Sequence, residues 1–131
     1  MVAALSEDIG RGDATTEALI AADASGRARI IAREALTVAG VAFAAAVFSE
    51  LDDEVSIDGH FGDGEKVQSD DCILTVSAQL RSLLTGERTA LNYLQRLSGI
   101  ATQAARYAEA VRGTGVLILD TRKTTPGWRV L

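Results

Sequence analysis

The sequence is poor in the residues that disulfide frameworks and metal centres require. A single cysteine, Cys72, excludes an intrachain disulfide, and a single histidine, His60, excludes a multi-histidine metal site. We interpret Cys72 as a small core residue and His60 as a surface histidine. Aromatic residues make up only 5% of the chain, so Ala, Val, Leu and Ile must build its core. With no basic leader before an apolar segment, and no apolar run near the roughly 20 residues of a membrane span, we expect a cytoplasmic protein without a membrane partner.

The composition is that of one soluble globular domain. Apolar residues contribute 47% and charged residues 24% of the 131 residues, which is enough for one ordinary domain and too few for two. The net charge of −5 would repel nucleic acid as well as an anionic membrane surface. We therefore expect no nucleic-acid partner, and any site for an anion must be a local cluster of cations.

The first part of the chain has the pattern of a mixed α/β domain. Residues 27–34 alternate, with Ala28 and Ile30 on one face and arginines on the other, which indicates a strand with one wet face. Residues 41–51 are rich in alanine and favour a helix. The expected elements are a turn-rich loop at 7–16, a helix at 17–22, strand at 27–34 continuing through 36–39, a helix at 41–51, and short β segments at 55–57, 61, 66–68 and 72–77.

From Leu80 the apolar period becomes helical. A stripe of leucines is expected to face the core, at positions 80, 83, 84, 91 and 94. Glu87 falls in the middle of this stripe, where a carboxylate needs a partner or access to water. Ser98 and Gly99 predict a break before a second helix at about 100–112. The unbroken apolar run 116–119 then predicts a parallel strand that is buried on both faces.

Two features suggest a site for an anion. Residues 121–131 contain three cations and no acid, and they follow the expected strand, where ligands of parallel α/β proteins bind. Arg122 and Lys123 offer a planar fork and a mobile point charge for a carboxylate or phosphate. Arg88 lies at the edge of the leucine stripe, on a face shared with Asn92 and Gln95. A solvated basic turn, and a stripe merely interrupted by ions that reach water, are the plainer alternatives.

Four segments resemble one family when they are taken together. They read Glu-Asp-Ile-Gly-Arg-Gly-Asp at 7–13, Gly-Glu-Arg-Thr-Ala-Leu-Asn at 86–92, Leu-Ser-Gly-Ile-Ala-Thr at 97–102, and Leu-Asp-Thr-Arg-Lys-Thr-Thr-Pro-Gly at 119–127. Their order and content are similar to quinolinate phosphoribosyltransferase, the carboxylating nicotinate-nucleotide pyrophosphorylase of NAD biosynthesis. The resemblance implies an α+β open sandwich in an amino-terminal domain at 1–97, followed at 98–131 by the start of an incomplete α/β barrel whose first strand is 116–120.

The resemblance also implies a reaction and a site. Quinolinate and phosphoribosyl pyrophosphate, with Mg²⁺, would give nicotinate mononucleotide, pyrophosphate and carbon dioxide. Thr121, Arg122 and Lys123 would bind the quinolinate carboxylates, and Arg88 would reach the site of a second subunit across a homodimer interface. No residue is assigned as catalytic, and the ligands of the Mg²⁺ are expected outside this chain.

Two departures from the family pattern affect these expectations. Trp128 stands where the family usually has leucine, so the packing of the loop after Gly127 is expected to differ. The chain also ends at Leu131, before the remaining barrel strands, and an unpaired barrel strand cannot bury itself. We therefore expect a fragment that is inactive on its own.

Other functions remain open at this point. A paralogue associated with molybdate transport shares the fold and several motifs, and nicotinate phosphoribosyltransferase is more distant. A biotinyl or lipoyl carrier is suggested by the glycine-punctuated stretch 59–77, although Lys66 is not placed between two clear strands. A purely structural dimerisation module would use the leucine stripe of residues 80–94.

Overall fold

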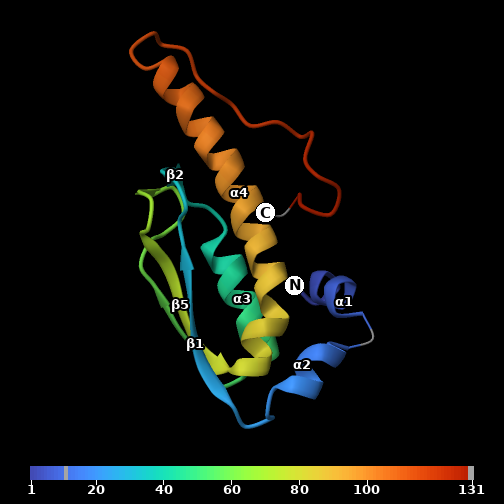
Figure 1. The fold of residues 1–131 in the computed structure, drawn as a ribbon. Helices are drawn as coiled ribbons and strands as arrows, with labels where there is room; N and C mark the ends of the chain where they lie inside the picture. Colours follow the sequence, from blue (N-terminus) through green and yellow to red (C-terminus); the bar gives the residue numbers. More distant parts are fainter. Residues whose placement is uncertain (11, 130–131) are drawn as a thin grey trace.

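The computed structural model describes residues 1–10 and 12–129. Parts of the loop prediction at Arg11 and of the barrel prediction at residues 130 and 131 lie outside these residues. The elements in chain order are α1 (Val2–Ile9), α2 (Ala14–Leu19), β1 (Ser25–Ile31), β2 (Leu36–Thr37), α3 (Val41–Leu51), β3 (Ser56–Gly59), β4 (Lys66–Val67), β5 (Cys72–Gln79) and α4 (Leu80–Ala110). Figure 1 shows α3 and α4 against one face of the sheet, with α1 and α2 on the opposite side of α4.

The main sheet has three antiparallel strands in the order β1-β5-β3. Its register explains the alternation of the sequence, because Ala28 lies opposite Val76 and Ile30 opposite Leu74 on the face that meets the helices. Arg29 lies opposite Thr75, and the arginines of β1 are exposed on the other face. The expected strand with one wet face is confirmed for residues 27–31, whereas residues 32–34 lie beyond the end of β1. A second sheet pairs β2 with β4 only, so residues 36–39 do not continue β1 as expected.

The core lies between the main sheet and α3. Helix α3 has the expected bounds, and it buries Ala44, Val47 and Phe48, which recur at the three- and four-residue spacing of one helical face. The side chains of Val47, Leu74 and Val76 are almost completely buried. Small aliphatic residues therefore build most of this core, as the scarcity of aromatic residues predicts.

Helix α4 turns only part of the predicted leucine stripe toward the core, since Leu83 and Leu94 are buried and Leu80 packs against the core. Its buried residues are Ser82, Leu83, Gly86, Thr89, Ala90, Leu94 and Ser98. Leu84 is 43% exposed and Leu91 is half-buried. The reason is the close approach of α3, since an added Cβ on Gly86 would lie 3.1 Å from the Phe48 ring. Small residues permit this contact, and the resulting rotation of α4 leaves Leu84 and Leu91 of the stripe outside the core.

The break expected at Ser98 and Gly99 is absent, because α4 runs unbroken through 31 residues. The Ser98 hydroxyl accepts a bond from the Ala39 amide at 3.0 Å and donates to the Ala39 carbonyl at 3.1 Å. One turn later the Thr102 hydroxyl accepts from the Thr37 amide at 2.9 Å. These hydroxyls bond the backbone of the β2 segment instead of competing with their own helix. No helix in the described residues, α4 included, combines the length and apolar character of a membrane span.

The two ends of the chain also differ from expectation. Residues 7–9 belong to α1, whose apolar Leu5 is buried, instead of to a loop. Residues 116–119 form no strand, and their side chains are 48–80% exposed. The physical reason is that neither described sheet includes a strand beside them, so their backbone has no ladder of hydrogen bonds. The predicted domain boundary between residues 97 and 98 lies inside α4 and stays a prediction.

Candidate functional site

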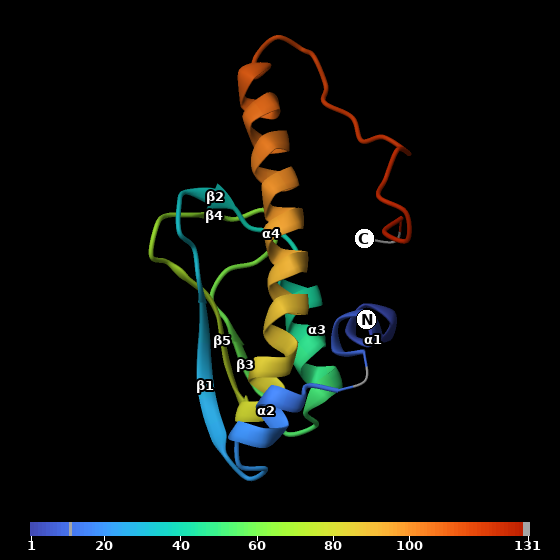
Figure 2. The same cartoon turned by 45° about the vertical axis from the view of Figure 1, so that its right-hand side comes forward.

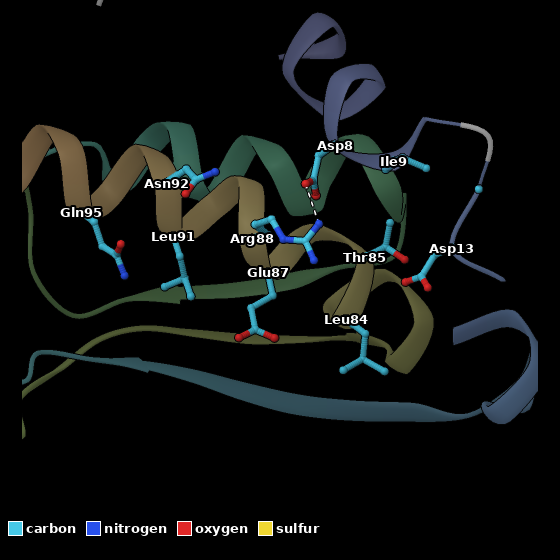
Figure 3. Close-up of a pocket in the computed structure, with 11 residues that line it drawn as sticks. Asp8, Ile9, Asp13, Leu84, Thr85, Glu87, Arg88, Leu91, Asn92 and Gln95 are labelled. Atoms are coloured by element: carbon cyan, nitrogen blue, oxygen red, sulfur yellow. Dashed lines mark hydrogen bonds and ion pairs between the residues drawn. The ribbon is translucent and has the colours of Figure 1, made fainter. Parts of the chain in front are cut away.

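A polar cleft lies between α1, the loop before α2 and the first half of α4. Its volume is about 490 Å³. Figure 3 shows the side chains that line it, and the helix turn at Thr85 to Arg88 forms its floor. The lining residues are Asp8, Ile9, Gly12, Asp13, Leu84, Thr85, Glu87, Arg88, Leu91, Asn92 and Gln95. The cleft therefore joins the motif at 7–13 to the motif at 86–92, which lie far apart in the sequence.

Arg88 is bound by a carboxylate of α1. Its Nη1 atom donates to Oδ1 of Asp8 at 2.8 Å, and the two side chains are 73% and 18% exposed, respectively. The hydrogen bond and the negative charge of Asp8 together raise the pKa of Arg88 above its usual value. The guanidinium therefore remains charged while most of it faces solvent.

Asp13 shapes the other wall of the cleft as the N-cap of α2. Its carboxylate accepts bonds from the Thr16 hydroxyl at 2.6 Å and from the Thr16 amide at 3.1 Å. These bonds hold the pKa of Asp13 below its usual value, because they favour the ionised carboxylate. Because Asp13 is the cap, the helix covers 14–19 and begins three residues before the expected range of 17–22.

The lowered pKa of Asp13 predicts an acid-sensitive contribution to stability. A carboxyl whose pKa is lower in the folded state stabilises the fold above its unfolded pKa of about 4 and loses this contribution as pH falls through the folded value. We expect Asp13→Asn to unfold more readily than the unsubstituted chain at neutral pH, with a smaller difference at pH 2, as measured by urea titration. Equal differences at both pH values would contradict this assignment. Asp23→Asn, at an exposed position beyond α2, is the matched control.

Glu87 does not face the core as its position in the leucine stripe predicts. The residue is exposed, and Figure 3 shows its carboxylate directed away from Arg88, toward β1. The exposure follows from the rotation of α4 that Gly86 allows. Among the described residues that line the cleft, Asp8, Asp13 and Glu87 are acidic and Arg88 is the one cation, so together they carry more negative than positive charge. By itself it is a poor site for a doubly charged anion.

The cationic segment lies in exposed coil after α4. Thr121, Arg122 and Lys123 are exposed, and Arg129 donates to the Arg122 carbonyl at 3.2 Å. None of these residues lines the cleft that contains Arg88. Figure 2 shows this red segment running beside α4 at a distance from it, before it turns back near α1. The structure thus does not bring Arg88 together with residues 121–123 in one cleft.

Trp128 connects the end of the cationic segment to α4. Its ring stacks on Tyr93 with centroids 5.2 Å apart, and Tyr93 in turn stacks on Phe43 of α3 at 5.7 Å. A leucine at position 128 could fill space against Tyr93 but could not extend this stack. The departure from the family pattern at this position therefore has a packing role in this chain.

The stack predicts a fluorescence change, because Trp128 is the only tryptophan. In the 131-residue chain, Tyr93→Leu is expected to shift Trp128 emission to the red and to increase its quenching by iodide, since the ring loses its stacking partner. Tyr107→Leu is the matched control on the same helix, because Tyr107 is 56% exposed and outside the stack. Identical spectra for the two variants would show that Trp128 does not pack on Tyr93 in solution.

The other residues considered as functional candidates, Cys72, His60 and Lys66, lie outside the cleft. Cys72 is half-buried at the start of β5 and lies outside the core, although we expected a small core residue there. His60 is exposed as expected, and its Nε2 lies 2.9 Å from the Thr75 hydroxyl. Lys66 lies within β4, opposite Thr37, and not at a hairpin tip where a carrier would present its lysine. Within residues 1–10 and 12–129, no group of three or more His, Cys, Asp or Glu side chains is arranged to hold a metal ion.

The fold and the cleft define the class of the protein as an α+β domain that presents an exposed arginine from a polar cleft. Comparison with known proteins identifies the family. Residues 13–98 match the family model described as quinolinate phosphoribosyl transferase, N-terminal domain, and residues 100–131 match the model of its C-terminal domain. This chain belongs to the quinolinate phosphoribosyl transferase family, as its motifs predict, and its α+β amino-terminal fold agrees with that membership.

Individual relatives agree with this assignment. The chain is 44% identical over 127 residues to a probable carboxylating nicotinate-nucleotide pyrophosphorylase of Synechocystis, covering 97% of this chain and 43% of that protein. It is 43% identical to the nicotinate-nucleotide pyrophosphorylase of Mycobacterium leprae, covering 98% and 46%. The crystal structure of NadC from Streptococcus pyogenes superposes with a TM-score of 0.92 at 40% identity, covering 98% of this chain and 47% of that one. The chain thus spans less than half the length of these relatives.

The sequence did not reveal Asp8 as the partner of Arg88. We interpreted residues 7–16 as turn and capping chemistry, and no spacing rule joins two residues that lie 80 positions apart. A local signal for α1 was present, since Leu5 and Ile9 are four residues apart and Gly10 follows as a C-cap. That signal predicts a helix that contains Asp8, about one turn after the buried Leu5.

Proposed function

We propose that this chain contributes the amino-terminal part of a quinolinate phosphoribosyltransferase. The reaction joins quinolinate to phosphoribosyl pyrophosphate and releases pyrophosphate and carbon dioxide, which leaves nicotinate mononucleotide. The observation that carries this proposal is the match, in chain order, to the models of both family domains. The similarity to proteins named nicotinate-nucleotide pyrophosphorylase and quinolinate phosphoribosyltransferase supports the choice of reaction. A cytoplasmic location is part of the proposal.

The proposed ligands of the quinolinate carboxylates are Thr121, Arg122 and Lys123. Quinolinate carries two adjacent carboxylates, which an arginine fork and a lysine ammonium match in charge and geometry. Each hydrogen bond to a charged group contributes about 1.5–3 kcal/mol net, so two or three of them dominate the affinity. Fixing the carboxylates also positions the ring nitrogen for attack on the anomeric carbon of the ribose. The exposure of all three residues supports a role toward a ligand.

Arg88 is proposed to enter the site of a second subunit in a homodimer. The charge of its own cleft supports this, because the described residues that line it include three carboxylates and one guanidinium. A complementary surface would be the segment 121–129, which has three cations and no acid. Exposed apolar side chains on α4, Leu84 at 43% and Ile100 at 56%, favour burial of this helix against a partner.

The groove between β1 and α4 extends this proposed interface. Its volume is about 540 Å³, and its apolar lining includes Ile30, Leu84 and Leu91. Because Leu84 lines both the groove and the cleft of Arg88, a partner that covered the groove would also approach the arginine. Leu84 and Leu91, the part of the leucine stripe that lies outside the core, are thus available for the dimer contact.

Mg²⁺ is proposed to accompany phosphoribosyl pyrophosphate, whose phosphate groups it would bind and neutralise. The carboxylates of Asp8 and Asp13 are engaged by Arg88 and Thr16, so they do not fit a metal site. The residues of this chain are therefore assigned no contact with the ion, and their proposed work is to bind and orient quinolinate.

Calorimetric titration tests the proposed substrate. The sample is the protein that extends this chain to the length of its relatives, called the full-length protein below. Quinolinate should bind it more tightly than nicotinate, because nicotinate lacks the second carboxylate. Preference for nicotinate, or binding of neither compound, would contradict the proposal and favour a paralogue with another substrate. The 131-residue chain alone is expected to give no turnover, since residues 116–119 have no strand beside them in the described sheets and residues 121–123 lie in exposed coil.

A further inference from the structure

We propose that Asp8 is a positioning residue that holds Arg88 in the orientation needed to bind a substrate carboxylate. This inference rests on the proposed function and assigns a role to the motif at 7–13. Asp13 of that motif is engaged as a helix cap, whereas the side chain of Asp8 accepts a hydrogen bond from Arg88. Arg88 and Asp8 would together form the part of the site that one subunit contributes to the site of the other.

The geometry indicates that Asp8 fixes the orientation of Arg88, which an ion pair between two fully exposed side chains would not do. Asp8 is the shielded partner, at 18% exposure, and it is carried by a helix whose Leu5 is buried in the core. Arg88 is the open partner, at 73% exposure. A shielded acid on an anchored helix can fix a long side chain that would otherwise sample many rotamers in solvent.

The contact leaves the arginine able to bind a second carboxylate. Asp8 engages Nη1 at 2.8 Å, and no other hydrogen bond to the Arg88 guanidinium occurs among the described residues. A guanidinium has five N–H donors in a rigid plane, so the edge formed by Nε and Nη2 remains available for a bidentate contact. Figure 3 shows the guanidinium beside Asp8 with this cleft around it.

The negative charge of Asp8 also opposes an incoming dianion, and the two effects must be compared. The repulsion acts across an open cleft, where water and salt screen it strongly. The ordering of the arginine is not screened, because it removes rotamer freedom that binding would otherwise have to remove. We therefore expect the positioning effect to exceed the repulsion, so that loss of Asp8 weakens binding.

Steady-state kinetics of the full-length protein test this role. Asp8→Asn is expected to raise the KM for quinolinate by about tenfold, with kcat and the KM for phosphoribosyl pyrophosphate changed less than about twofold, since uniform binding of one substrate is lost. Asp8→Glu restores the charge and should recover part of the affinity. Glu7→Gln, which neutralises the neighbouring exposed acid of α1, is the matched control and should leave all constants unchanged. An unchanged KM in Asp8→Asn, or equal effects of Asp8→Asn and Glu7→Gln, would overturn the inference.

A measurement on the 131-residue chain separates this inference from the proposed function. Nitrogen-15 NMR of the arginine side chains should show slowed rotation of the Arg88 guanidinium, and Asp8→Asn should restore fast rotation while the backbone spectrum keeps its dispersion. Fast rotation in the unsubstituted chain would overturn the positioning role whatever the substrate is. Slowed rotation together with no quinolinate turnover by the unsubstituted full-length protein would overturn the proposed function and, with it, the link to quinolinate.

Discussion

Replacing Arg122 by alanine in the full-length protein is expected to lower kcat/KM for quinolinate by about 100-fold or more. A bidentate arginine–carboxylate contact contains two charge-assisted hydrogen bonds, and the loss of about 3 kcal/mol corresponds to roughly 100-fold. Because the substrate is a dianion, an unpaired carboxylate in a water-poor site adds a desolvation cost. Arg122 is exposed in this chain and supports no core contact, so the variant should fold normally.

Arg112→Ala is the matched control for this prediction. Arg112 lies just beyond α4, it is exposed, and it pairs locally with Glu109, so its removal changes the net charge by the same amount. Steady-state assays with quinolinate as the varied substrate should show a near-normal kcat/KM for Arg112→Ala. Equal losses in both variants would reduce the effect to a general loss of positive charge. Normal kinetics in Arg122→Ala would remove Arg122 from the site.

Gly40→Ala is expected to lower the free energy of unfolding of the 131-residue chain by about 3 kcal/mol. Gly40 precedes α3 with φ +95°, a conformation that is strained for any residue with a Cβ. An added Cβ would also lie 2.7 Å from Cδ1 of Leu97 and 3.4 Å from the Tyr93 carbonyl. The methyl group would therefore push apart α3 and α4, whose contact supports the cleft.

Urea unfolding followed by circular dichroism measures this effect. The matched control is Gly99→Ala, because Gly99 lies within α4 and an added Cβ there meets no atom within 4 Å. Helix propensity predicts that this control gains up to about 1 kcal/mol. Opposite signs for the two substitutions are the expected outcome. A loss in Gly99→Ala comparable to that in Gly40→Ala would mean that the helix contact near Gly40 has no special role.

Local patterns in the sequence predicted the elements that depend on local physics. Helix α3 has the expected bounds, because an alanine-rich segment is helical in most surroundings and acidic residues end it. Strand β1 shows the expected alternation, since one face meets the core and the other meets water. In both cases the pattern of residues that are close in the sequence is enough to indicate the type of element, although β1 also pairs with β5.

Elements that depend on distant partners were predicted less well. The buried face of α4 is set by the approach of α3 to Gly86, and a hydrophobic stripe gives no information on that contact. Ser98 looked like a helix breaker because its partner, the Ala39 backbone, is 59 residues away. The run 116–119 has the composition of a buried strand, but a strand requires neighbours that are not among the described elements.

The candidate site shows the same division. The motifs at 86–92 and 119–127 identified the family and named Arg88, Thr121, Arg122 and Lys123, because charge and order along the chain can be read directly. The contact between Arg88 and Asp8 came only from the structure. In the proposed homodimer, Arg88 and Arg122 meet in one site only through a second subunit, which the structure of a single chain does not include.

Activity in mixed dimers tests the shared site most directly. Full-length Arg88→Ala and Arg122→Ala proteins, each nearly inactive alone, are unfolded and refolded together so that subunits exchange. If Arg88 serves the partner's site, each mixed dimer contains one site with both arginines, and the mixture should regain about a quarter of the unsubstituted activity. If both arginines act within one subunit, every site lacks one of them. A mixture that contains mixed dimers, shown by differential tags, and yet stays inactive would contradict the account.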